Sequence, residues 1–338
     1  MTPYANIGPG YNVMLTDSGG PIWKDCEIAV LQRISTEPTL RLMHMLKDRG
    51  VPTILDMDDN LHQVSRWNPA FEVYSNGKKG TKIFEQALVL ADYVTVSTKR
   101  LADDYAKFRD EFVICENFIP SWAFKQLAPA AITGLEKRAG SLRVGYVGSS
   151  SHQEDMLILA KPLRKLVERH PNVTLVFFGT SPQDLPDLVK GRVEYHGYVD
   201  PAPEDNPNQF FAKYWTKFKT MQLDVALIPI QPNLFNAGKS FLKVMEYGAV
   251  GWPCIATNFG PYRDYRSRNP EGIVLADTEK EWVAALETLL EEHSGFERRK
   301  SLAISNFCYV RDHHTTEFGI LPWRKLLARI VHERKLRE

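Results

Sequence analysis

The chain has 338 residues, enough for two ordinary domains with buried cores. Its 42 lysines and arginines are balanced by 41 aspartates and glutamates, so the chain as a whole lacks the basic excess of a nucleic-acid-binding protein. The four cysteines are widely spaced, no apolar run reaches transmembrane length, and no signal peptide is visible. We therefore expect a cytoplasmic protein with free thiols, for which peripheral contact with a membrane stays open.

The first part of the chain alternates short apolar runs with amphipathic stretches, which predicts an α/β fold. Strands are expected at residues 26–32, 52–57, 93–97 and 112–117, and helices at 37–49, 83–91 and 99–108. The segment 128–140 is expected to be a linker to a second α/β domain.

An acidic cluster follows the strand expected at 52–57. Asp56, Asp58 and Asp59 lie at the carboxyl end of that strand, which is where open α/β sheets bind ligands. Their mutual repulsion favours a raised pKa on one of them, a bound cation, or an acceptor hydroxyl as partner. His62 follows closely, and a structural role is its alternative.

The segment 63–81 is expected to be a loop in which aromatic and basic residues are interleaved. Aromatic rings suit sugar faces or nucleobases, and cations suit phosphate, so this loop is a candidate acceptor-binding element. An ordinary surface loop is the alternative. The candidate residues are Arg66, Trp67, Tyr74, Lys78 and Lys79.

The second part opens with a strand expected at 142–147, followed by the small residues Gly148 and Ser149, then His152 and a helix at 155–170. A strand, a small-residue loop and a helix in this order are typical of phosphate binding. Further strands are expected at 173–179, 193–198, 224–230, 253–257 and 273–276, and helices at 210–220, 239–247, 282–292 and from 321 onward. A loop rich in proline and aspartate is expected at 201–207.

The helix expected at 239–247 carries Lys239, Lys243 and Glu246 at helical spacing, so we expect all three on one face. Asn236 and Gly238 at its start would leave backbone N–H groups open to a phosphate. Glu246 is unfavourably placed for the helix dipole, which suggests a binding role. A solvated Lys/Lys/Glu face is the alternative.

Three motifs resemble glycosyltransferases of the GT-B type, specifically family 4 (glycosyl transferases group 1). N-x-G-K-S-x-x-K-x-x-E-Y-x-x-x-G-x-P, starting at Asn236, resembles their donor-binding segment, and G-x-x-G-S-x-x-H-x-x-D, starting at Gly145, resembles the opening of their second domain. V-P-T-I-L-D-M-D-D-N-L-H, starting at Val51, resembles a bacterial and phage subset. The arm from Ile7 to Tyr11 is weakly similar to the family's glycine-rich loop.

The resemblance implies two Rossmann-like domains facing across a cleft, with the N-terminal one shortened. Residues 1–127 would form the acceptor domain, 141–310 the nucleotide-sugar domain, and 311–338 a helix that packs back on the first. The activity implied is sugar transfer from a nucleotide sugar, foremost a UDP-sugar, to an acceptor hydroxyl with retention of configuration.

The resemblance also implies residue roles. Glu246 would hold the ribose, whereas the second glutamate that the family often carries eight positions earlier is replaced here by Gly238. The other donor-binding residues implied are Gly148, Ser149, His152, Tyr198, Asn236, Gly238, Lys239, Ser240 and Lys243. Asp58, Asp59 and His62 would orient the acceptor and carry the catalytic role.

Several alternatives stay open at this point. The acceptor is either a glycan or lipid-linked glycan, or a hydroxymethylated base in phage DNA, and the balanced charge counts against DNA. No cofactor is required beyond the nucleotide sugar, and a divalent metal is not favoured, although the acidic cluster also resembles the D-x-D of metal-dependent single-domain enzymes. The replacement at Gly238 leaves open a non-catalytic nucleotide-sugar-binding subunit, and a nucleotide-sugar 2-epimerase is a third reading.

Overall fold

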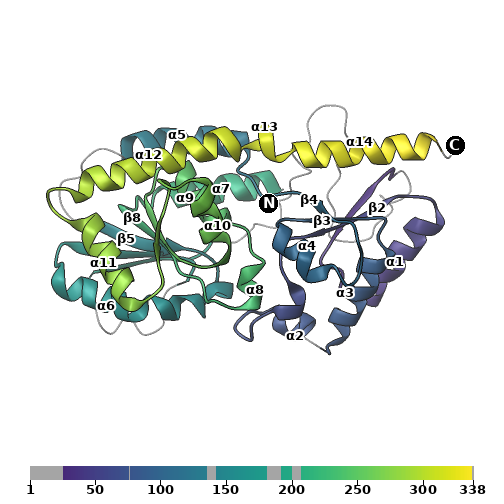
Figure 1. Cartoon of the computed structure of the whole chain (residues 1–338), viewed down its shortest axis with the longest axis horizontal. Coiled ribbons are helices and arrows are strands. Elements are labelled where there is room, and N and C mark those ends of the chain that lie inside the picture. The colour runs from purple at the N-terminus through teal and green to yellow at the C-terminus, as the bar shows by residue number, and fades with distance from the viewer. Residues whose placement is uncertain (1–25, 76, 135–141, 181–191, 200–206, 337–338) are drawn as a thin grey trace. The chain divides into compact units, whose positions relative to one another are not determined.

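The computed structural model describes residues 26–75, 77–134, 142–180, 192–199 and 207–336 (Figure 1). The arm from Ile7 to Tyr11 and most of the loop expected at 201–207 lie outside these ranges, as does the second half of the expected linker. The chain divides into two units. Unit 1 takes in the described residues up to Phe118, the segment Asn233–Ser240, and the stretch from Thr316. Unit 2 takes in Ile119–Pro232 and Phe241–Thr315.

Unit 1 is built on a parallel sheet in the order β1-β2-β3-β4. Its strands are β1 (Ala29–Gln32), β2 (Thr53–Met57), β3 (Tyr93–Val96) and β4 (Val113–Ile114). They are connected mainly by the helices α1 (Glu37–Asp48), α3 (Lys79–Leu90) and α4 (Lys99–Tyr105). Because parallel strands in sequence order are joined by right-handed crossovers, all three helices lie on one face of the sheet.

The two faces of this sheet pack against different partners. Leu55 and Met57 of β2 share a core cluster with α1, α3 and α4. Ile54, which precedes Leu55 in β2, points to the opposite face, where it packs with Trp323 of α14 (Leu321–Lys335). The C-terminal helix therefore closes the second face of the unit 1 sheet (Figure 1).

Unit 2 is a doubly wound Rossmann-like domain. Its parallel sheet has the order β10-β9-β8-β5-β6-β7, so the strand order reverses between β5 and β8, which is where such folds bind their ligands. The strands are β5 (Leu142–Val147), β6 (Val173–Phe178), β7 (Val193–His196), β8 (Val225–Ile228), β9 (Cys254–Thr257) and β10 (Val274–Ala276).

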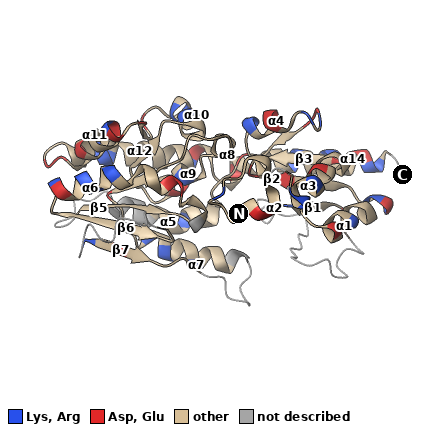
Figure 2. Cartoon of the chain, turned by 90° about the horizontal axis from the view of Figure 1, so that it is seen from below, with Lys and Arg blue, Asp and Glu red and all other residues tan. Residues whose placement is uncertain are grey.

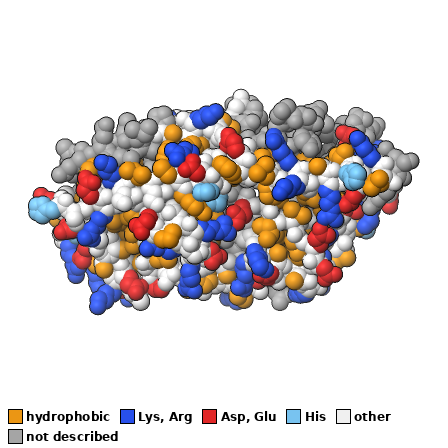
Figure 3. All heavy atoms as spheres, turned by 45° about the horizontal axis from the view of Figure 1, so that its top comes forward, with side chains coloured by type: hydrophobic (Ala, Val, Ile, Leu, Met, Phe, Trp, Pro, Cys, Tyr) orange, Lys and Arg blue, Asp and Glu red, His pale blue; other side chains and the backbone are white. Residues whose placement is uncertain are grey.

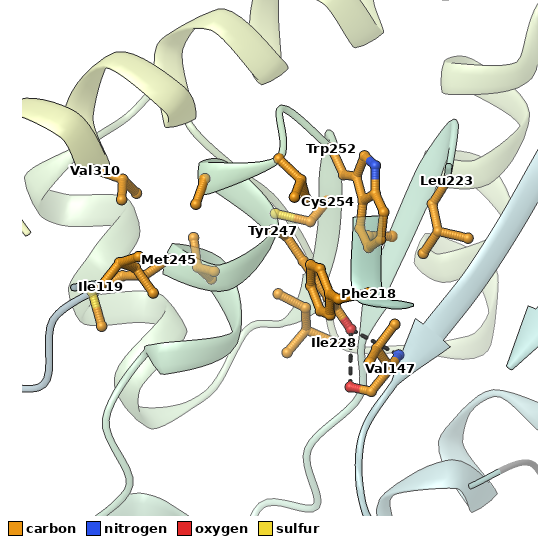
Figure 4. Packing of buried hydrophobic residues seen from close by; sticks show 14 of the residues in the cluster. Ile119, Val147, Phe218, Leu223, Ile228, Met245, Tyr247, Trp252, Cys254 and Val310 are labelled. Carbon is orange, nitrogen blue, oxygen red and sulfur yellow. Dashed lines mark hydrogen bonds between the residues drawn. The ribbon is translucent and has the colours of Figure 1, made fainter. Parts of the chain in front are cut away.

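Both faces of the unit 2 sheet are covered by helices, which is why its central strands are almost entirely apolar. One face packs on α6 (Ala160–Arg169) and α11 (Glu279–Leu290). The other packs on α5 (Ser121–Gly134), α7 (Pro207–Lys219), α9 (Leu242–Ala249) and α12 (Gly295–His313). On this second face the Tyr247 hydroxyl accepts a 3.0 Å hydrogen bond from the Val147 amide, which ties α9 to the end of β5 (Figure 4).

Three of the differences between the expected and the observed elements bear on the linker and on the candidate site residues. Part of the expected linker is helical, because α5 extends through Gly134. The expected loop 63–81 starts at the last residue of η3 (Leu61–Gln63) and contains the one-turn helix α2 (Phe71–Tyr74), and α3 already begins at Lys79. The helix expected from Lys239 begins only at Leu242, because Asn233 caps a separate one-turn helix, α8 (Leu234–Ala237), and the chain then leaves the helical conformation.

The elements not yet named are η4 (Ser150–His152), η5 (Asp155–Ile158), α10 (Gly260–Arg268) and α13 (Thr316–Gly319). Basic and acidic side chains are interspersed on the face shown in Figure 3, in keeping with the balanced composition. Among the described residues, every helix is too short or too polar to cross a bilayer.

Candidate functional site

The strand-order reversal in unit 2 places the loop after β5 beside the loop after β8. β5 ends at Val147 and is followed by Gly148, whose amide donates to the Phe178 carbonyl at 3.0 Å. A Cβ at Gly148 would lie 2.1 Å from the Tyr146 hydroxyl, so only glycine fits there. Ser149 follows with its hydroxyl 2.7 Å from that of Ser151. A turn of small residues after a parallel strand is typical of phosphate binding.

Asp155 joins the two loops across the switch point. Its carboxylate is buried, with one oxygen 2.9 Å from His152 Nδ1 and the other accepting the Gln231 amide at 2.7 Å. His152 and Gln231 are therefore held by one side chain. Asp155 is present in the G-x-x-G-S-x-x-H-x-x-D motif, but sequence reasoning did not select it as a site residue.

Lys243 and Glu246 form an ion pair on α9, with 2.8 Å between Nζ and Oε2. Their side chains are only 17% and 10% exposed, so the pair is weakly screened by solvent. Glu246 Oε1 has no hydrogen bond within the described ranges. Lys243 Nζ also lies 6.0 Å from the ring centroid of Tyr146. The pair thus offers one cation and one carboxylate oxygen to a ligand near the end of β5.

A wall of aromatic rings lies near this pair. Tyr198 is 43% exposed, and its ring lies 5.9 Å from that of Phe178 and 6.1 Å from that of Tyr214. Burial, together with the Glu246 carboxylate, raises the pKa of Tyr198. The tyrosine therefore stays protonated at neutral pH, and its side chain is partly open to solvent.

The segment Asn233–Ser240 does not continue into α9 but packs within unit 1. Lys239 Nζ lies 3.1 Å from Asp59 Oδ1 and 4.5 Å from the ring centroid of Phe235. This corrects the expectation that Lys239 shares a helical face with Lys243 and Glu246, because the helix begins three residues after Lys239.

The other expected donor residues of this segment also contact unit 1. The Gly238 carbonyl accepts a 2.9 Å hydrogen bond from the Thr98 hydroxyl, and the Ser240 hydroxyl accepts one of 2.8 Å from Asn117 Nδ2. Asn236 is buried, with its amide bonded to the Asn233 side chain. Because the Asn236 backbone N–H is already hydrogen-bonded, it is not open to a phosphate. The prediction that Asn236 leaves its backbone N–H free for phosphate is therefore wrong.

The acidic cluster after β2 is partly divided. Asp56 accepts hydrogen bonds from Thr95 at 2.7 Å and Gln32 at 2.6 Å, and burial raises its pKa. Asp58 and Asp59 instead both lie 3.8 Å from an Arg33 nitrogen. Desolvation and then repulsion by Asp59 raise the pKa of Asp58, although half of its side chain is exposed and solvent screens part of this effect.

Arg33 is not among the site residues predicted from the sequence. It follows β1 directly and has a φ of +50°, a conformation that is uncommon for residues other than glycine. Its place at the carboxyl end of a parallel strand is the signal that could have identified it.

His62 does not join Asp58 and Asp59 but lines a cavity of about 230 Å³ with Glu85, Arg100, Asp104 and Lys107. Its Nε2 lies 3.1 Å from Glu85 Oε1 without hydrogen-bond geometry to any described residue. Burial lowers the pKa of His62, and Lys107 lowers it further against the opposing effect of Glu85. The imidazole also packs 5.1 Å from the Tyr105 ring, so a structural role accounts for its position.

The expected acceptor residues separate into two groups. Arg66 and Trp67 are exposed, and the Trp67 ring is available at the surface. Lys78 and Lys79 are also exposed but pair with Glu72 and Glu37. Tyr74 is buried and donates a 2.6 Å hydrogen bond to the Arg33 carbonyl. The prediction that Tyr74 contacts an acceptor is therefore corrected, since its ring belongs to the unit 1 core.

No cluster of three or more histidine, cysteine, aspartate or glutamate side chains in the described part of the chain could hold a metal ion. Asp56 is hydrogen-bonded to Thr95, whereas Asp58 and Asp59 lie near Arg33.

A model of the family described as glycosyl transferases group 1 matches residues 141–292. A search of curated protein sequences found no match. Among solved structures, sucrose-phosphate synthase from Thermosynechococcus elongatus has 14% identity and a TM-score of 0.62, covering 91% of this chain and 74% of its own.

Two further structures show the same fold. Pneumococcal O-GlcNAc transferase GtfA, in complex with UDP and GlcNAc, has 14% identity and a TM-score of 0.58, covering 90% of this chain and 57% of its own. Anabaena HepE, in complex with UDP and glucose, has 13% identity and a TM-score of 0.56, covering 89% of this chain and 77% of its own. Residues 141–292 thus match the model of glycosyl transferases group 1, and the chain shares with these solved structures the GT-B fold of two Rossmann-like units.

Proposed function

We propose that the protein transfers a sugar from a UDP-sugar to the hydroxyl of a glycan or lipid-linked glycan, with retention of configuration. The observation that carries this proposal is the buried Lys243–Glu246 pair on α9 of the group 1 domain, near the switch point of the sheet. The choice of UDP is supported by two structural neighbours that were solved with it.

The donor is held by unit 2 in this proposal. Glu246 Oε1 accepts hydrogen bonds from the ribose hydroxyls, while Lys243 and the backbone after Gly148 face the diphosphate. Tyr198 stacks on the uracil ring, which its partly exposed aromatic side chain suits. Asp155 keeps His152 and Gln231 in place around the sugar. These preorganised groups stabilise the negative charge that develops on the leaving UDP.

In the transfer step, the bond between the sugar C1 and the β-phosphate oxygen breaks. The acceptor oxygen forms the new bond to C1 on the same face, and its proton passes to the departing phosphate oxygen. Asp59 orients the acceptor hydroxyl as a hydrogen-bond acceptor, and its own position is fixed by Lys239 at 3.1 Å and Arg33 at 3.8 Å. The reaction needs no protein nucleophile.

A carbohydrate acceptor is preferred to DNA because of the charge distribution in unit 1. The exposed Lys78 and Lys79 already pair with Glu72 and Glu37, and the whole chain carries a formal net charge of only +1. Duplex binding usually requires an unpaired basic surface, because affinity comes largely from the release of counterions by phosphate contacts.

The donor part is tested with a thermal-shift screen of UDP-, GDP-, ADP- and CMP-sugars, followed by product analysis. We expect a rise in melting temperature with a UDP-sugar, slow release of UDP, and transfer to a carbohydrate acceptor with the anomeric configuration kept. If a UDP-sugar binds but no glycan accepts the sugar, the protein is not a glycan transferase. If sugar is transferred only to hydroxymethylated DNA, the proposed carbohydrate acceptor is wrong.

The residue assignment is tested with Glu246→Gln. Loss of the charged acceptor should raise the Kd for UDP about tenfold, as expected for the loss of charge-assisted hydrogen bonds. Glu168→Gln on the exposed face of α6 is the matched control and should leave the Kd unchanged. Calorimetric titration with UDP measures both. Equal affinities in the two variants would remove Glu246 from the site.

Asp59→Asn tests the acceptor side separately. It should leave the Kd for UDP unchanged and reduce the transfer rate, because only the orientation of the acceptor hydroxyl is lost. Asp103→Asn, an exposed aspartate of α4, is its control. A normal transfer rate in Asp59→Asn would exclude this aspartate from the reaction.

A further inference from the structure

Unit 1 contains a second, larger cavity, which the transferase proposal does not use. Its volume is about 680 Å³, and Pro52, Asp92 and Val113 line it at the amino ends of β2, β3 and β4. Asp58 and Asp59 follow the carboxyl end of β2. The cavity therefore lies at the opposite edge of the sheet from the acidic cluster, bordered by α1 and α14, whose basic and acidic residues are shown in Figure 2.

The lining of this cavity has an excess of positive charge. Five cations and three carboxylates line it, which gives a net charge of +2. The cations are Lys47, Arg49, Arg109, Arg329 and Arg334, and the carboxylates are Asp92, Glu111 and Glu333.

The three carboxylates are all engaged by partners within the unit. Asp92 accepts hydrogen bonds from the Thr53 amide at 2.8 Å and the Thr53 hydroxyl at 2.9 Å. Arg329 bridges the other two, at 2.6 Å from Glu111 and 2.7 Å from Glu333. The Arg329 side chain is thus committed to Glu111 and Glu333, while the charge of Asp92 acts on Arg109. Lys47 and Arg49 remain without a carboxylate partner among the described residues.

The cations beside α1 and α3 have a different kind of partner. Arg109 donates to the carbonyls of Ala91 at 2.9 Å and Asp92 at 3.1 Å, and Lys47 lies 3.4 Å from the Leu90 carbonyl. These neutral oxygens orient the side chains without cancelling their charge. Arg49, at the end of α1, is exposed, and no carboxylate in the described part of the chain lies within ion-pair distance of it.

We propose that this cavity binds a phosphate-bearing ligand. The phosphate would lie against Lys47 and Arg49, since the Arg49 guanidinium can bind phosphate through paired hydrogen bonds. Arg109, whose nitrogens already donate to backbone carbonyls, would add positive charge. Val51, Val94 and Ile330 also line the cavity and would contact a less polar part of the ligand. An apolar lining with a few convergent charged groups is the usual composition of a ligand site. The phosphate belongs either to a soluble metabolite or to a lipid headgroup.

The test compares Lys47→Ala/Arg49→Ala with Arg41→Ala/Lys82→Ala in the full chain. All four side chains are exposed in unit 1, but only Lys47 and Arg49 line the cavity. Inorganic pyrophosphate is titrated calorimetrically in the presence of saturating UDP, so that the residues of unit 2 are occupied. Co-sedimentation with phosphatidylcholine vesicles, with and without phosphatidic acid, is measured in parallel.

We expect the cavity variant to weaken binding of pyrophosphate, or of the phosphatidic acid vesicles, about tenfold, while the control variant matches the wild type. Loss confined to pyrophosphate identifies a soluble ligand, and loss confined to the vesicles identifies a headgroup. Equal binding by the two variants, or no binding of either probe by the wild type, would overturn the proposal. Because the site is in unit 1 and needs no sugar transfer, this result is independent of the Glu246 test.

Discussion

At the scale of single residues, Asp155 shows how one buried carboxylate can organise a site. It holds the His152 ring and the Gln231 amide, which come from the loops after two different strands. The motif containing Asp155 is visible in the sequence, whereas the pairing with Gln231 depends on β5 and β8 being neighbours in the sheet. That adjacency is a property of the topology, and residue spacing does not encode it.

Asp155→Ala should lower the free energy of unfolding by about 3 kcal/mol, because two hydrogen-bonding groups lose a buried charged partner. Asp155→Asn should cost only about 1 kcal/mol, since the amide oxygen can still accept from Gln231 and the amide nitrogen can donate to the imidazole. Urea denaturation measures both. Equal destabilisation by the two substitutions would show that the charge of Asp155, rather than its hydrogen bonds, stabilises the loops.

Tyr74 and Lys239 are two residues whose side-chain direction could not be predicted from the sequence. An aromatic residue in a basic loop is a reasonable surface ligand, yet Tyr74 ends the one-turn helix α2 and its hydroxyl reaches the Arg33 carbonyl. Lys239 fits a helical face with Lys243, but the intervening turn directs it to Asp59. In both cases a local turn, which propensity alone does not specify, decides the direction of the side chain.

At the scale of elements, the segment Asn233–Ser240 is fitted closely to α4. A Cβ at Gly238 would lie 2.9 Å from Leu101 Cδ2, and Leu101 is fully buried. The glutamate that the family often has at this position would meet this packed core. The absence of the second glutamate therefore has a local steric explanation.

Gly238→Ala should destabilise the protein by about 1–2 kcal/mol, because the added methyl group overpacks a buried contact. In the Leu101→Ala background, which removes the atom it meets, the same substitution should cost close to nothing. A double-mutant cycle by urea denaturation gives the coupling energy. Additive effects would mean that Gly238 is required for a reason other than Leu101.

Helix α14 covers the sheet face opposite the crossover helices, and Trp323 lies fully buried against Ile54 and Cys115. Trp323→Ala should lower the free energy of unfolding by about 3–5 kcal/mol, as for other large core truncations. Arg324→Ala, which changes an exposed neighbour on the same helix, should stay within about 0.5 kcal/mol of the wild type. Similar urea midpoints for the two variants would contradict the packing role of the helix.

At the scale of the whole molecule, His314 links stability to pH. Burial, and then the nearby charges of Arg268 and His313, lower the pKa of His314 to about 4. In the unfolded chain the same imidazole titrates near its ordinary value of about 6.5. Between these two values the unfolded state binds more protons, so stability falls as the pH is lowered from about 6.5 to about 4.

The loss attributable to His314 should reach about 2–3 kcal/mol at the lower end of that interval, at roughly 1.4 kcal/mol for each pH unit. His314→Gln removes the titrating group and should flatten the pH dependence of the urea midpoint by this amount. His332→Gln on the exposed side of α14 is the control. A wild-type slope in His314→Gln would assign the acid sensitivity to other groups.

Most of the architecture could be predicted from the sequence, because buried parallel strands are short apolar runs. β5 was expected at 142–147 and lies there, and β9 and β10 differ from expectation by one residue at their starts. The GT-B fold was predicted correctly as well, and residues 141–292 match the model of the family that the sequence motifs resemble. The membership of Asn233–Ser240 in unit 1 could not be predicted, because it depends on contacts such as Thr98 to Gly238 between residues far apart in sequence.

The discontinuous composition of unit 1 has a consequence for how the protein is made. Among the described residues, its second sheet face, with Ile54, Cys115 and Phe118, packs against residues from Thr316 onward. A ribosome adds about 5–20 residues per second. This apolar face therefore stays uncovered by α14 until the whole of unit 2 has been synthesised. Unit 2, whose last residue is Thr315, can complete its core first. The nascent chain therefore exposes a half-finished first domain for many seconds, which makes it a natural substrate for chaperones that bind apolar surface.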